Sequence, residues 1–358
     1  MKPLIRATVD AAALRHNLAR VRATAPGARV MAVIKANAYG HGLVPAARAL
    51  GLTDGFAVAR LEEGLALRAA GLANPVLLLE GVFSPGQLAV AAQQRFDIMV
   101  HSFEQLELLE GRGDGGPLTA WLKVDTGMNR LGFRVEQFAA AWERLRRVPN
   151  VTPDPTLVTH LACADEVDDP RTSAQLRTFE EITAGRGGAR SIANSAGLFA
   201  WPASRADWVR PGIALYGVSP FPAGTGRELG LRPAMTLRTQ VIAVREVRSG
   251  ETVGYGGTWR ASRPTRIAVV AAGYGDGYPR GVGSGTPVLV GGHRAHVVGR
   301  VSMDMLTVDV TSLPGVVPGD EVVLWGEGLP VEEIALHAGT IPYELICGVS
   351  QRVHLEVD

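Results

Sequence analysis

Lysine is scarce in this sequence, and its scarcity draws attention to the positions that keep it. Lys and Arg together number 36 in 358 residues, yet only Lys2, Lys35 and Lys123 are lysines. An arginine stays protonated and cannot form an imine, whereas a lysine can. Lys35 and Lys123 lie well inside the chain, so we expect them to do chemistry that arginine cannot do. Lys2 needs no such explanation.

Lys35 follows the apolar start of the run AVIKANAYGHG, residues 32–42. A lysine at the end of a buried strand is well placed to form an imine with a carbonyl compound. The alternative is a structural lysine whose stem packs on apolar surface while its charge reaches water. This run alone favours neither interpretation.

Two later runs carry residues suited to holding an anion. Ser195 lies in SIANSAGLF, and Gly212 and Ile213 lie in VRPGIALYG. A hydroxyl and the backbone N–H groups of a turn can together cradle a phosphate dianion. A Pro-Gly turn by itself is more often only a turn. Together with Lys35 the two runs predict a site that binds an anionic group.

The first part of the chain alternates short apolar runs with segments of helical periodicity, which predicts a (β/α)8 barrel over residues 1–225. A doubly wound sheet is the alternative fold. Barrels carry their catalytic groups at the carboxyl ends of the strands, and the loops after strands seven and eight frequently bind phosphate. The apolar runs begin near Val30, Gly55, Pro75, Phe96, Leu118, Thr156, Ala189 and Trp208, and the helical segments include Leu61–Ala70, Ser102–Glu110, Val135–Val148 and Thr172–Ala184.

The pattern changes after about Phe221, where residues 217–233 are rich in Pro and Gly and predict a linker. Closely spaced β-like runs separated by turn residues then predict a mostly antiparallel β-domain over residues 226–358. One short helix, Val331–Ala338, is expected within it. The runs are Gln240–Val247, Thr265–Ala272, Pro287–Val290, Ala295–Val298, Met305–Val310 and Glu321–Trp325.

Composition excludes several classes of protein. The net charge is +1, so no basic field would attract nucleic acid or an anionic membrane. Cys163 and Cys347 are the only cysteines, which gives neither a disulfide framework nor a metal-binding spacing. The N-terminus lacks the apolar stretch of a signal peptide, and no run reaches the ~18 apolar residues of a membrane span. We therefore expect a cytoplasmic protein without a metal.

A series of motifs, in order along nearly the whole chain, resembles the alanine racemase family. The resemblance implies a pyridoxal 5'-phosphate enzyme of fold type III and a head-to-tail homodimer. It also implies active sites that combine the barrel of one subunit with the β-domain of its partner. The motifs are AVIKANAYGHG, KVDTGMNRLGF from Lys123, VRPGIALYG around Arg210, VGYGGTW around Tyr255, GRVSMD around Met303 and IPYE around Tyr343.

The resemblance gives the cofactor-binding residues. It makes Lys35 the lysine that holds the cofactor as an imine, and it places Arg210 opposite the pyridine nitrogen. An arginine there does not yield its proton, so the ring nitrogen should stay unprotonated and transamination should be suppressed. The implied phosphate contacts are Tyr39, Ser195, Gly212, Ile213 and Tyr343.

Racemisation needs proton removal on one face of the substrate and delivery on the other, and two acid–base groups do this most simply. The resemblance implies Lys35 for the proton of the D-isomer and Tyr255, arriving from the partner subunit, for that of the L-isomer. Because tyrosine has an ordinary pKa of about 10, it needs help to act as a base. We expect His160, hydrogen-bonded between Tyr255 and Arg210, to give that help.

Lys123 has two interpretations. In related racemases the matching lysine is found carbamylated, which turns a cation into an anion that orients an arginine, here Arg130, near the substrate and the cofactor's phenolic oxygen. The alternative is a lysine paired with Asp125. Sequence does not separate them.

The remaining implied residues concern the substrate. Met303 of the partner and Asp304 contribute backbone N–H groups near its carboxylate. Tyr255, Tyr274 and Tyr343 leave a cramped pocket, which favours alanine over longer side chains. A bacterial source would suggest either supply of D-alanine for cell-wall precursors or catabolism of alanine, and the sequence does not separate the two.

Three alternatives stay open at this stage. A racemase for serine or for several amino acids is the first, because such pockets separate alanine from serine by only roughly 10²-fold. A decarboxylase of basic amino acids is the second, and Arg210 argues against it. A pyridoxal-phosphate carrier is the third, and such carriers resemble the barrel alone.

Overall fold

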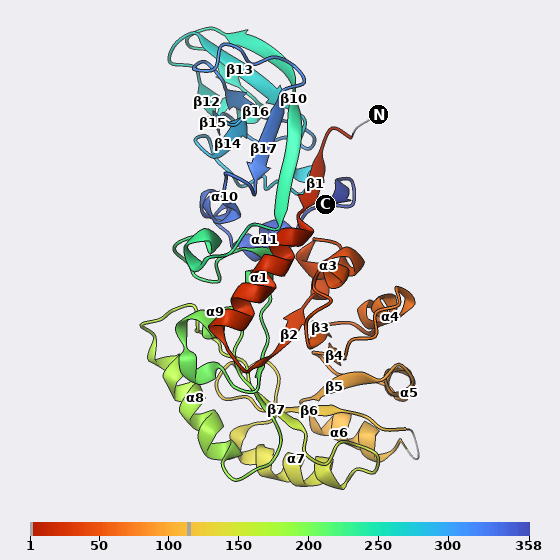
Figure 1. The fold of residues 1–358 in the computed structure, drawn as a ribbon. Coiled ribbons are helices and arrows are strands. Elements are labelled where there is room, and N and C mark those ends of the chain that lie inside the picture. The colour runs from red at the N-terminus through yellow and green to blue at the C-terminus, as the bar shows by residue number, and fades with distance from the viewer. Residues whose placement is uncertain (1–2, 113–115) are drawn as a thin grey trace.

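Eight parallel strands close into a barrel in the computed structural model, which describes residues 3–112 and 116–358. Lys2 lies outside the described residues. The last strand pairs with the first, Arg29 opposite Trp208, so the ring is complete and the alternative of a doubly wound sheet is wrong. The predicted barrel is confirmed (Figure 1). Its strands are β2 (Arg29–Val33), β3 (Gly55–Val58), β4 (Val76–Leu78), β5 (Phe96–Val100), β6 (Ala120–Lys123), β7 (Thr156–Val158), β8 (Arg190–Ser191) and β9 (Trp208–Val209).

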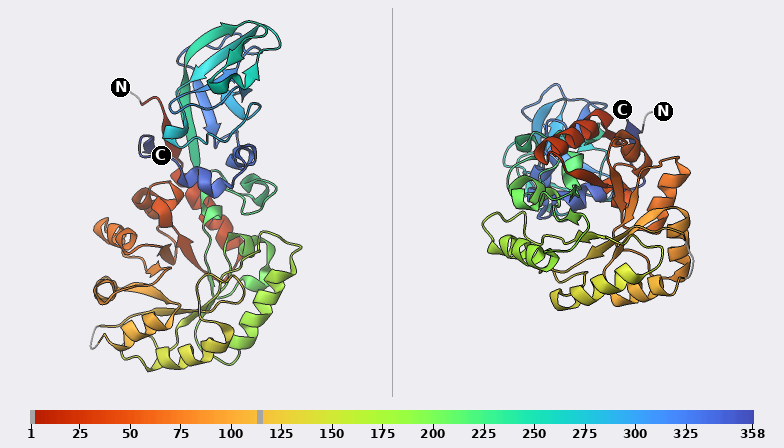
Figure 2. Two further views of the ribbon diagram at one scale, coloured as in Figure 1. Left: turned by 180° about the vertical axis from the view of Figure 1, so that it is seen from behind. Right: turned by 60° about the horizontal axis from the view of Figure 1, so that its bottom comes forward.

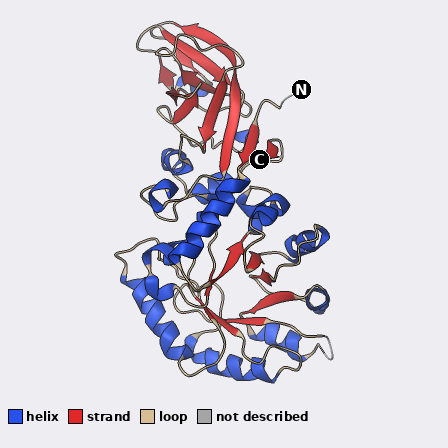
Figure 3. Ribbon diagram, in the orientation of Figure 1, coloured by secondary structure: helices blue, strands red, loops and turns tan. Residues whose placement is uncertain are grey.

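Helices follow the strands and form the outer layer (Figure 3). In α7 the buried residues Phe138, Ala141, Trp142 and Leu145 recur at helical spacing, so one face packs on the barrel and the other faces solvent. An additional helix, α1, precedes the first barrel strand and begins at the capping side chain of Asp10. The helices are α1 (Ala11–Thr24), α2 (Lys35–Tyr39), α3 (Leu43–Ala49), α4 (Leu61–Ala69), α5 (Pro85–Gln93), α6 (Phe103–Glu110), α7 (Val135–Arg147), α8 (Pro170–Thr183) and α9 (Ser195–Ala200).

The rest of the chain forms a mostly antiparallel β-domain, as predicted, at one end of the barrel (Figure 1). Its main sheet has the order β13-β16-β15-β14-β17-β10-β1-β18, and β13 also pairs with β10. The expected helix Val331–Ala338 is present as α10, and α11 (Pro342–Cys347) follows it. The strands are β10 (Met235–Val247), β11 (Thr252–Val253), β12 (Trp259–Arg260), β13 (Thr265–Val270), β14 (Pro287–Val290), β15 (His293–Val297), β16 (Leu306–Asp309), β17 (Glu321–Trp325) and β18 (His354–Val357).

Strands from near the two ends of the chain lie side by side close to the junction of the two domains (Figure 2). Strand β1 (Arg6–Val9) pairs antiparallel with β10 and parallel with β18, so the N-terminal segment lies in the sheet of the β-domain. We propose the division into residues 1–225 and 226–358 for the two domains, with β1 as the segment that crosses from one to the other.

The segment 217–233, predicted as a linker, is packed against both domains. It contains a short 3-10 helix, η3 (Gly226–Leu229). The side chain of Asn17 donates to the carbonyl oxygens of Leu215 and Arg232, and Glu332 of α10 accepts from two N–H groups of the segment. It therefore fixes the two domains to each other. No helix in residues 3–112 or 116–358 is both long and apolar enough to cross a bilayer.

Candidate active site

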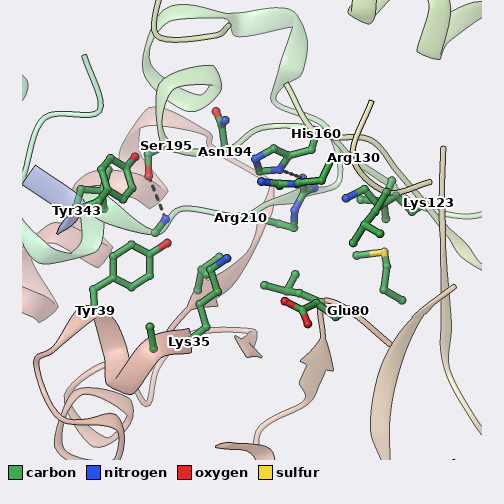
Figure 4. Close-up of a pocket in the computed structure, with 18 of the residues that line it drawn as sticks. Lys35, Tyr39, Glu80, Lys123, Arg130, His160, Asn194, Ser195, Arg210 and Tyr343 are labelled. Atoms are coloured by element: carbon green, nitrogen blue, oxygen red, sulfur yellow. Dashed lines mark hydrogen bonds between the residues drawn. The ribbon is translucent and has the colours of Figure 1, made fainter. Parts of the chain in front are cut away.

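A cavity of about 470 Å³ opens at the rim formed by the carboxyl ends of the barrel strands. Lys35 follows β2 by two residues, Lys123 ends β6, and Arg210 comes directly after β9. Their side chains all reach the cavity (Figure 4). The rim position expected from the barrel fold therefore explains why residues so far apart in sequence meet. The lining residues are Val33, Lys35, Ala36, Tyr39, Leu79, Glu80, Met99, Lys123, Arg130, Leu131, Val158, His160, Asn194, Ser195, Arg210, Gly212, Ile213, Tyr343 and Cys347.

Lys35 begins a turn with an unusual backbone. The four residues after it, 36–39, have φ angles of 53–54°, which is the left-handed helical region. This conformation costs a residue other than glycine roughly 1–2 kcal/mol. The turn reverses the chain directly after β2, so Lys35 and Tyr39, its first and last residues, both line the cavity. Sequence analysis predicted a strand end here and missed the turn.

One end of the cavity has the character of an anion cradle. Ser195 Oγ accepts hydrogen bonds from the N–H groups of Gly212 (3.0 Å) and Ala214 (3.3 Å), which ties the start of α9 to the loop after β9. A Cβ on Gly212 would lie 2.4 Å from the Tyr39 hydroxyl, so only glycine permits this close approach. Burial raises the pKa values of Tyr39 and Tyr343, so both phenols stay protonated and can donate.

Arg210 forms the opposite wall and is almost fully buried. Its guanidinium donates to Ser191 Oγ at 2.6 Å and to the carbonyl oxygen of Thr159 at 2.8 Å. Burial lowers the pKa of Arg210 to about 10, which still leaves it charged at neutral pH.

His160 lies against Arg210, with Nδ1 3.4 Å from Nη2. Burial, together with the charge of Arg210, holds the pKa of His160 well below its ordinary value, so the imidazole is neutral. Because the guanidinium can only donate, Nδ1 is the acceptor and Nε2 carries the proton. The positive charge available to help a tyrosine base is therefore that of Arg210, while His160 can supply a hydrogen bond.

Lys123 is buried on the far side of the cavity from the anion cradle (Figure 4). Burial, and next the charges of Arg210 and Arg130, lower its pKa to about 8. Asp125 instead accepts the N–H groups of residues 127–129 and lies 3.7 Å from Arg134. Among the described ion pairs none joins Lys123 to Asp125, although the charge of Asp125 partly offsets the lowering of the Lys123 pKa.

The cavity is strongly cationic. Lys35, Lys123, Arg130 and Arg210 line it, and Glu80 is the one carboxylate among its lining residues. Such a field favours a ligand with several negative charges. In the described part of the chain no group of three or more His, Cys, Asp or Glu side chains is arranged to hold a metal ion.

Of the predicted residues from the β-domain, Tyr343 lines this cavity, and the other four lie outside it. Tyr255, in η4 (Tyr255–Gly257), is 69% exposed, and Met303 is 52% exposed. Tyr274 is 41% exposed, and the carboxylate of Asp304 is paired with Arg352 at 2.8 Å. Within the described residues of one chain no hydrogen bond joins Tyr255 to His160, so His160 contacts only one of its two expected partners.

Three lining residues with polar or ionisable side chains were not predicted from the sequence: Glu80, Asn194 and Cys347. Glu80 follows β4 by two residues and Asn194 follows β8 by three, so a systematic search of strand ends would have found both. Cys347 ends α11 and carries no comparable signal in the sequence.

These side chains fit pyridoxal phosphate. The cofactor needs a lysine for its aldehyde, neutral donors for its phosphate and a partner for its ring nitrogen. Lys35 lies between the anion cradle and Arg210 (Figure 4). At the cradle the Tyr39 hydroxyl lies close to Gly212, so the donors expected to bind the phosphate are near one another.

Comparisons with known proteins agree with this geometry. Residues 9–220 match the family model of the alanine racemase N-terminal domain, and residues 234–357 match that of the C-terminal domain. An alanine racemase of Shewanella sediminis is 52% identical over 358 residues, with all of both chains covered. One of Aeromonas hydrophila is 53% identical over 352 residues, covering 98% of each chain.

Solved structures give the same result. The crystal structure of the biosynthetic alanine racemase of Pseudomonas aeruginosa aligns with a TM-score of 0.96 and 48% identity, with full coverage of both chains. The alanine racemase of Bartonella henselae, solved with covalently bound pyridoxal phosphate, aligns with a TM-score of 0.89 and 30% identity, again with full coverage.

Proposed function

The chain belongs to the alanine racemase family and is an isomerase, and we propose that it interconverts L- and D-alanine with pyridoxal 5'-phosphate bound at Lys35. The observation that carries this proposal is the cavity at the barrel rim, where a lysine, an anion cradle and a buried arginine line one space.

Residues of the barrel and α11 would hold the cofactor. Lys35 would bind its aldehyde carbon, and Arg210 would donate to its ring nitrogen. When bound, the cofactor withdraws electrons from the substrate Cα and so makes its proton acidic. The phosphate would be held by the hydroxyls of Tyr39, Ser195 and Tyr343 and by the backbone N–H groups of Ile213 and Gly212. The N–H of Gly212 would then share its hydrogen between the phosphate and Ser195 Oγ.

Arg210 tunes this chemistry through its charge. A pKa of about 10 keeps the guanidinium protonated, so it can donate to the ring nitrogen and cannot accept a proton from it. Electron withdrawal is then moderate, which favours return of the proton to Cα over its delivery elsewhere and disfavours transamination.

Two residues move the proton. Lys35 takes or returns it on one face of Cα, and Tyr255 does so on the other. Because Tyr255 is 69% exposed on the β-domain of its own chain, we propose that it acts in the barrel cavity of a second copy. Met303 reaches the substrate carboxylate in the same way, and the enzyme is a homodimer whose two sites are both shared.

His160 is the link between the two halves in this scheme. Its Nε2–H is free to donate to the phenolate of the partner's tyrosine, while its Nδ1 accepts from Arg210. The phenolate is thereby stabilised by the hydrogen bond from His160, which is itself hydrogen-bonded to the cationic Arg210.

Lys123 is proposed to be carbamylated and, in that form, to orient Arg130 beside the substrate. The lowered pKa of Lys123, about 8, leaves an appreciable fraction as the neutral amine that reacts with carbon dioxide. Carbon-13 NMR of protein equilibrated with labelled bicarbonate should give a carbamate signal that Lys123→Arg abolishes; an unchanged spectrum would contradict the assignment.

Alanine is the proposed substrate, with serine or a broader set of amino acids as the alternative. Tyr343, which lines the cavity, would leave a cramped substrate pocket together with Tyr255 and Tyr274. D-alanine made in the cytoplasm would serve as a precursor of the bacterial cell wall.

Incubation of the purified protein with L-alanine in D2O tests the proposal. D-alanine carrying deuterium at Cα is the expected product, read by chiral chromatography and by mass. Exchange without D-alanine would mean that only one base works. No exchange with alanine, but exchange with serine, would transfer the proposal to the alternative substrate.

A further inference from the structure

The turn that carries Lys35 is held in place by side chains that the proposed chemistry does not use. Residues 36–39 form a left-handed turn without a glycine, and Gly40 continues it with φ 81°. The other residues besides glycine that have positive φ in the described part of the chain, Arg95, Asn129 and Asn150, are isolated. A run of this kind persists only where its surroundings over-determine it.

Glu63 of α4 fixes the start of the turn. Its Oε1 accepts the N–H of Ala36, the residue directly after Lys35, at 2.7 Å. Its Oε2 accepts the N–H groups of Ala59 (2.9 Å) and Arg60 (3.0 Å) at the start of α4. One carboxylate therefore ties the turn to the next barrel strand and its helix, and hydrogen bonds to a charged acceptor are the stronger kind.

His41 fixes the end of the turn. Its Nδ1 lies 3.1 Å from the carbonyl oxygen of Ala38 and 2.9 Å from that of Tyr39. Since carbonyl oxygens only accept, Nδ1 must carry the proton. The ring packs on Tyr216, with the centroids 4.5 Å apart, and the ring of Tyr39 stacks on the same tyrosine with the centroids 4.8 Å apart.

The protonation of His41 indicates that its role is to donate a hydrogen bond from Nδ1 to the turn. The residue is fully buried, and burial lowers its pKa to about 4, so the ring is neutral. Its Nε2 is then a buried acceptor, and none of the described residues is its hydrogen-bond partner. A buried acceptor without a partner lowers stability, so filling space is a poor account of this residue.

We propose that Glu63 and His41 are positioning residues that hold the left-handed turn and thereby set the positions of Lys35 and the Tyr39 hydroxyl relative to each other. The part that concerns the cofactor rests on the proposed function. The part that concerns the turn does not, because it depends only on contacts within the chain. Gly40 is the third support, since a Cβ there would lie 2.1 Å from the carbonyl oxygen of Ile346 in α11.

Two pairs of variants separate positioning from a general structural role. In His41→Asn the amide nitrogen can stand where Nδ1 stood, whereas in His41→Gln it reaches toward the position of Nε2; both variants lose the ring. Glu63→Gln keeps the side-chain shape but replaces one acceptor oxygen with a donor. Its control is Ser84→Ala, which removes the hydrogen bond to Gln87 N at the start of α5 without touching the turn.

Amide hydrogen exchange reads the turn without reference to activity. We expect His41→Gln and Glu63→Gln to speed exchange in residues 36–43 roughly tenfold or more, because a hydrogen bond in the buried turn is lost. His41→Asn should stay near the wild type in that segment, and Ser84→Ala should change only α5. Equal exchange in His41→Asn and His41→Gln, or no effect of Glu63→Gln, would overturn the proposal.

Cofactor affinity and kinetics read the consequence for Lys35. His41→Gln and Glu63→Gln should weaken binding of pyridoxal phosphate about tenfold and lower kcat with little change in KM for alanine. His41→Asn should keep the cofactor affinity and the kcat near those of the wild type. Borohydride reduction of the wild type should fix the label on the peptide containing Lys35. A label elsewhere would overturn the proposed function, whereas the exchange data would still decide whether the turn is held as described.

Discussion

The barrel rim and the exposed face of the β-domain are opposites in their physical character. At the rim, Lys123, Ser195 and Arg210 are 8%, 3% and 5% exposed, and burial lowers the pKa values of Lys123, His160 and Arg210. On the β-domain, Tyr255 and Met303 are 69% and 52% exposed. The residues of the rim are therefore buried and fixed by contacts within their own chain, whereas the proposed site residues of the β-domain are exposed on its surface.

This difference in burial agrees with the different roles that we propose for the two sets of residues. Groups that hold a charged cofactor must be fixed before it binds, and the rim provides this through buried hydrogen bonds such as that from Arg210 to Ser191. A tyrosine that must act on the opposite face of the substrate cannot come from the same wall. In our account, association of two copies supplies it.

Loss of Lys35 should have the largest effect on the barrel half. Lys35→Arg keeps the positive charge but cannot form an imine, so we expect racemisation to fall by at least roughly 10⁴-fold. Chiral chromatography of the product gives the rate. A variant that retained a tenth of the wild-type activity would show that Lys35 is not the cofactor lysine.

Loss of the Tyr255 hydroxyl should be the largest effect on the β-domain half. Tyr255→Phe should lower racemisation by roughly 10²–10⁴-fold, the usual contribution of one general base. Because Tyr255 is not among the proposed contacts of the cofactor, the cofactor absorbance should be unchanged. Undiminished activity would refute the two-base scheme.

Arg210→Gln should change the products more than the rate. Losing a charged hydrogen bond at the ring nitrogen should slow racemisation about tenfold. Transamination should rise, because the ring can then be protonated. Pyruvate formation, measured beside the D-alanine yield, checks this; an unchanged ratio of the two products would contradict the role given to Arg210.

Asp97 is a buried carboxyl group with a shifted pKa that lies outside the proposed active site, so its replacement should change stability and not activity. It lies near the start of β5, at the end of the barrel away from the rim, and accepts from Trp121 Nε1 at 3.0 Å. Burial raises its pKa to about 6, whereas the hydrogen bond to Trp121 partly offsets this shift. Since the folded state binds this proton more tightly than the unfolded chain, stability should fall as the pH rises from about 4 to about 6.

Asp97→Asn should therefore stabilise the protein by about 1 kcal/mol at pH 8, with no gain below about pH 4, and leave racemisation unaltered. Thermal unfolding at the two pH values measures this smallest effect. A gain that is equal at both would mean that ionisation of Asp97 is not its cause.

Sequence predicted the elements whose burial pattern is local and simple. Strands β3 and β4 are buried along their whole length and form continuous apolar runs, and eight mainly apolar runs in alternation with helical segments predicted the fold class. The rim positions of Lys35, Ser195 and Gly212 followed from the same topology, whereas the role of Arg210 came from the resemblance to the alanine racemase family.

Elements that depend on distant contacts were missed. Strand β1 is four residues long and exists through pairing with β10 and β18, which come from the other end of the chain. The left-handed turn at residues 36–39 contains no glycine to signal it, because Glu63 and His41 stabilise it from outside. The charge state of His160 also depends on Arg210, 50 residues away in sequence.

Co-expression of Lys35→Arg with Tyr255→Phe tests the central claim, that each active site takes its lysine and its tyrosine from different copies. Each variant alone should be inactive. If the claim is right, mixed dimers contain one site with both native residues, and random pairing should restore about a quarter of the wild-type rate per chain. No recovery in dimers confirmed to be mixed would contradict the claim and place both residues of a site on one chain.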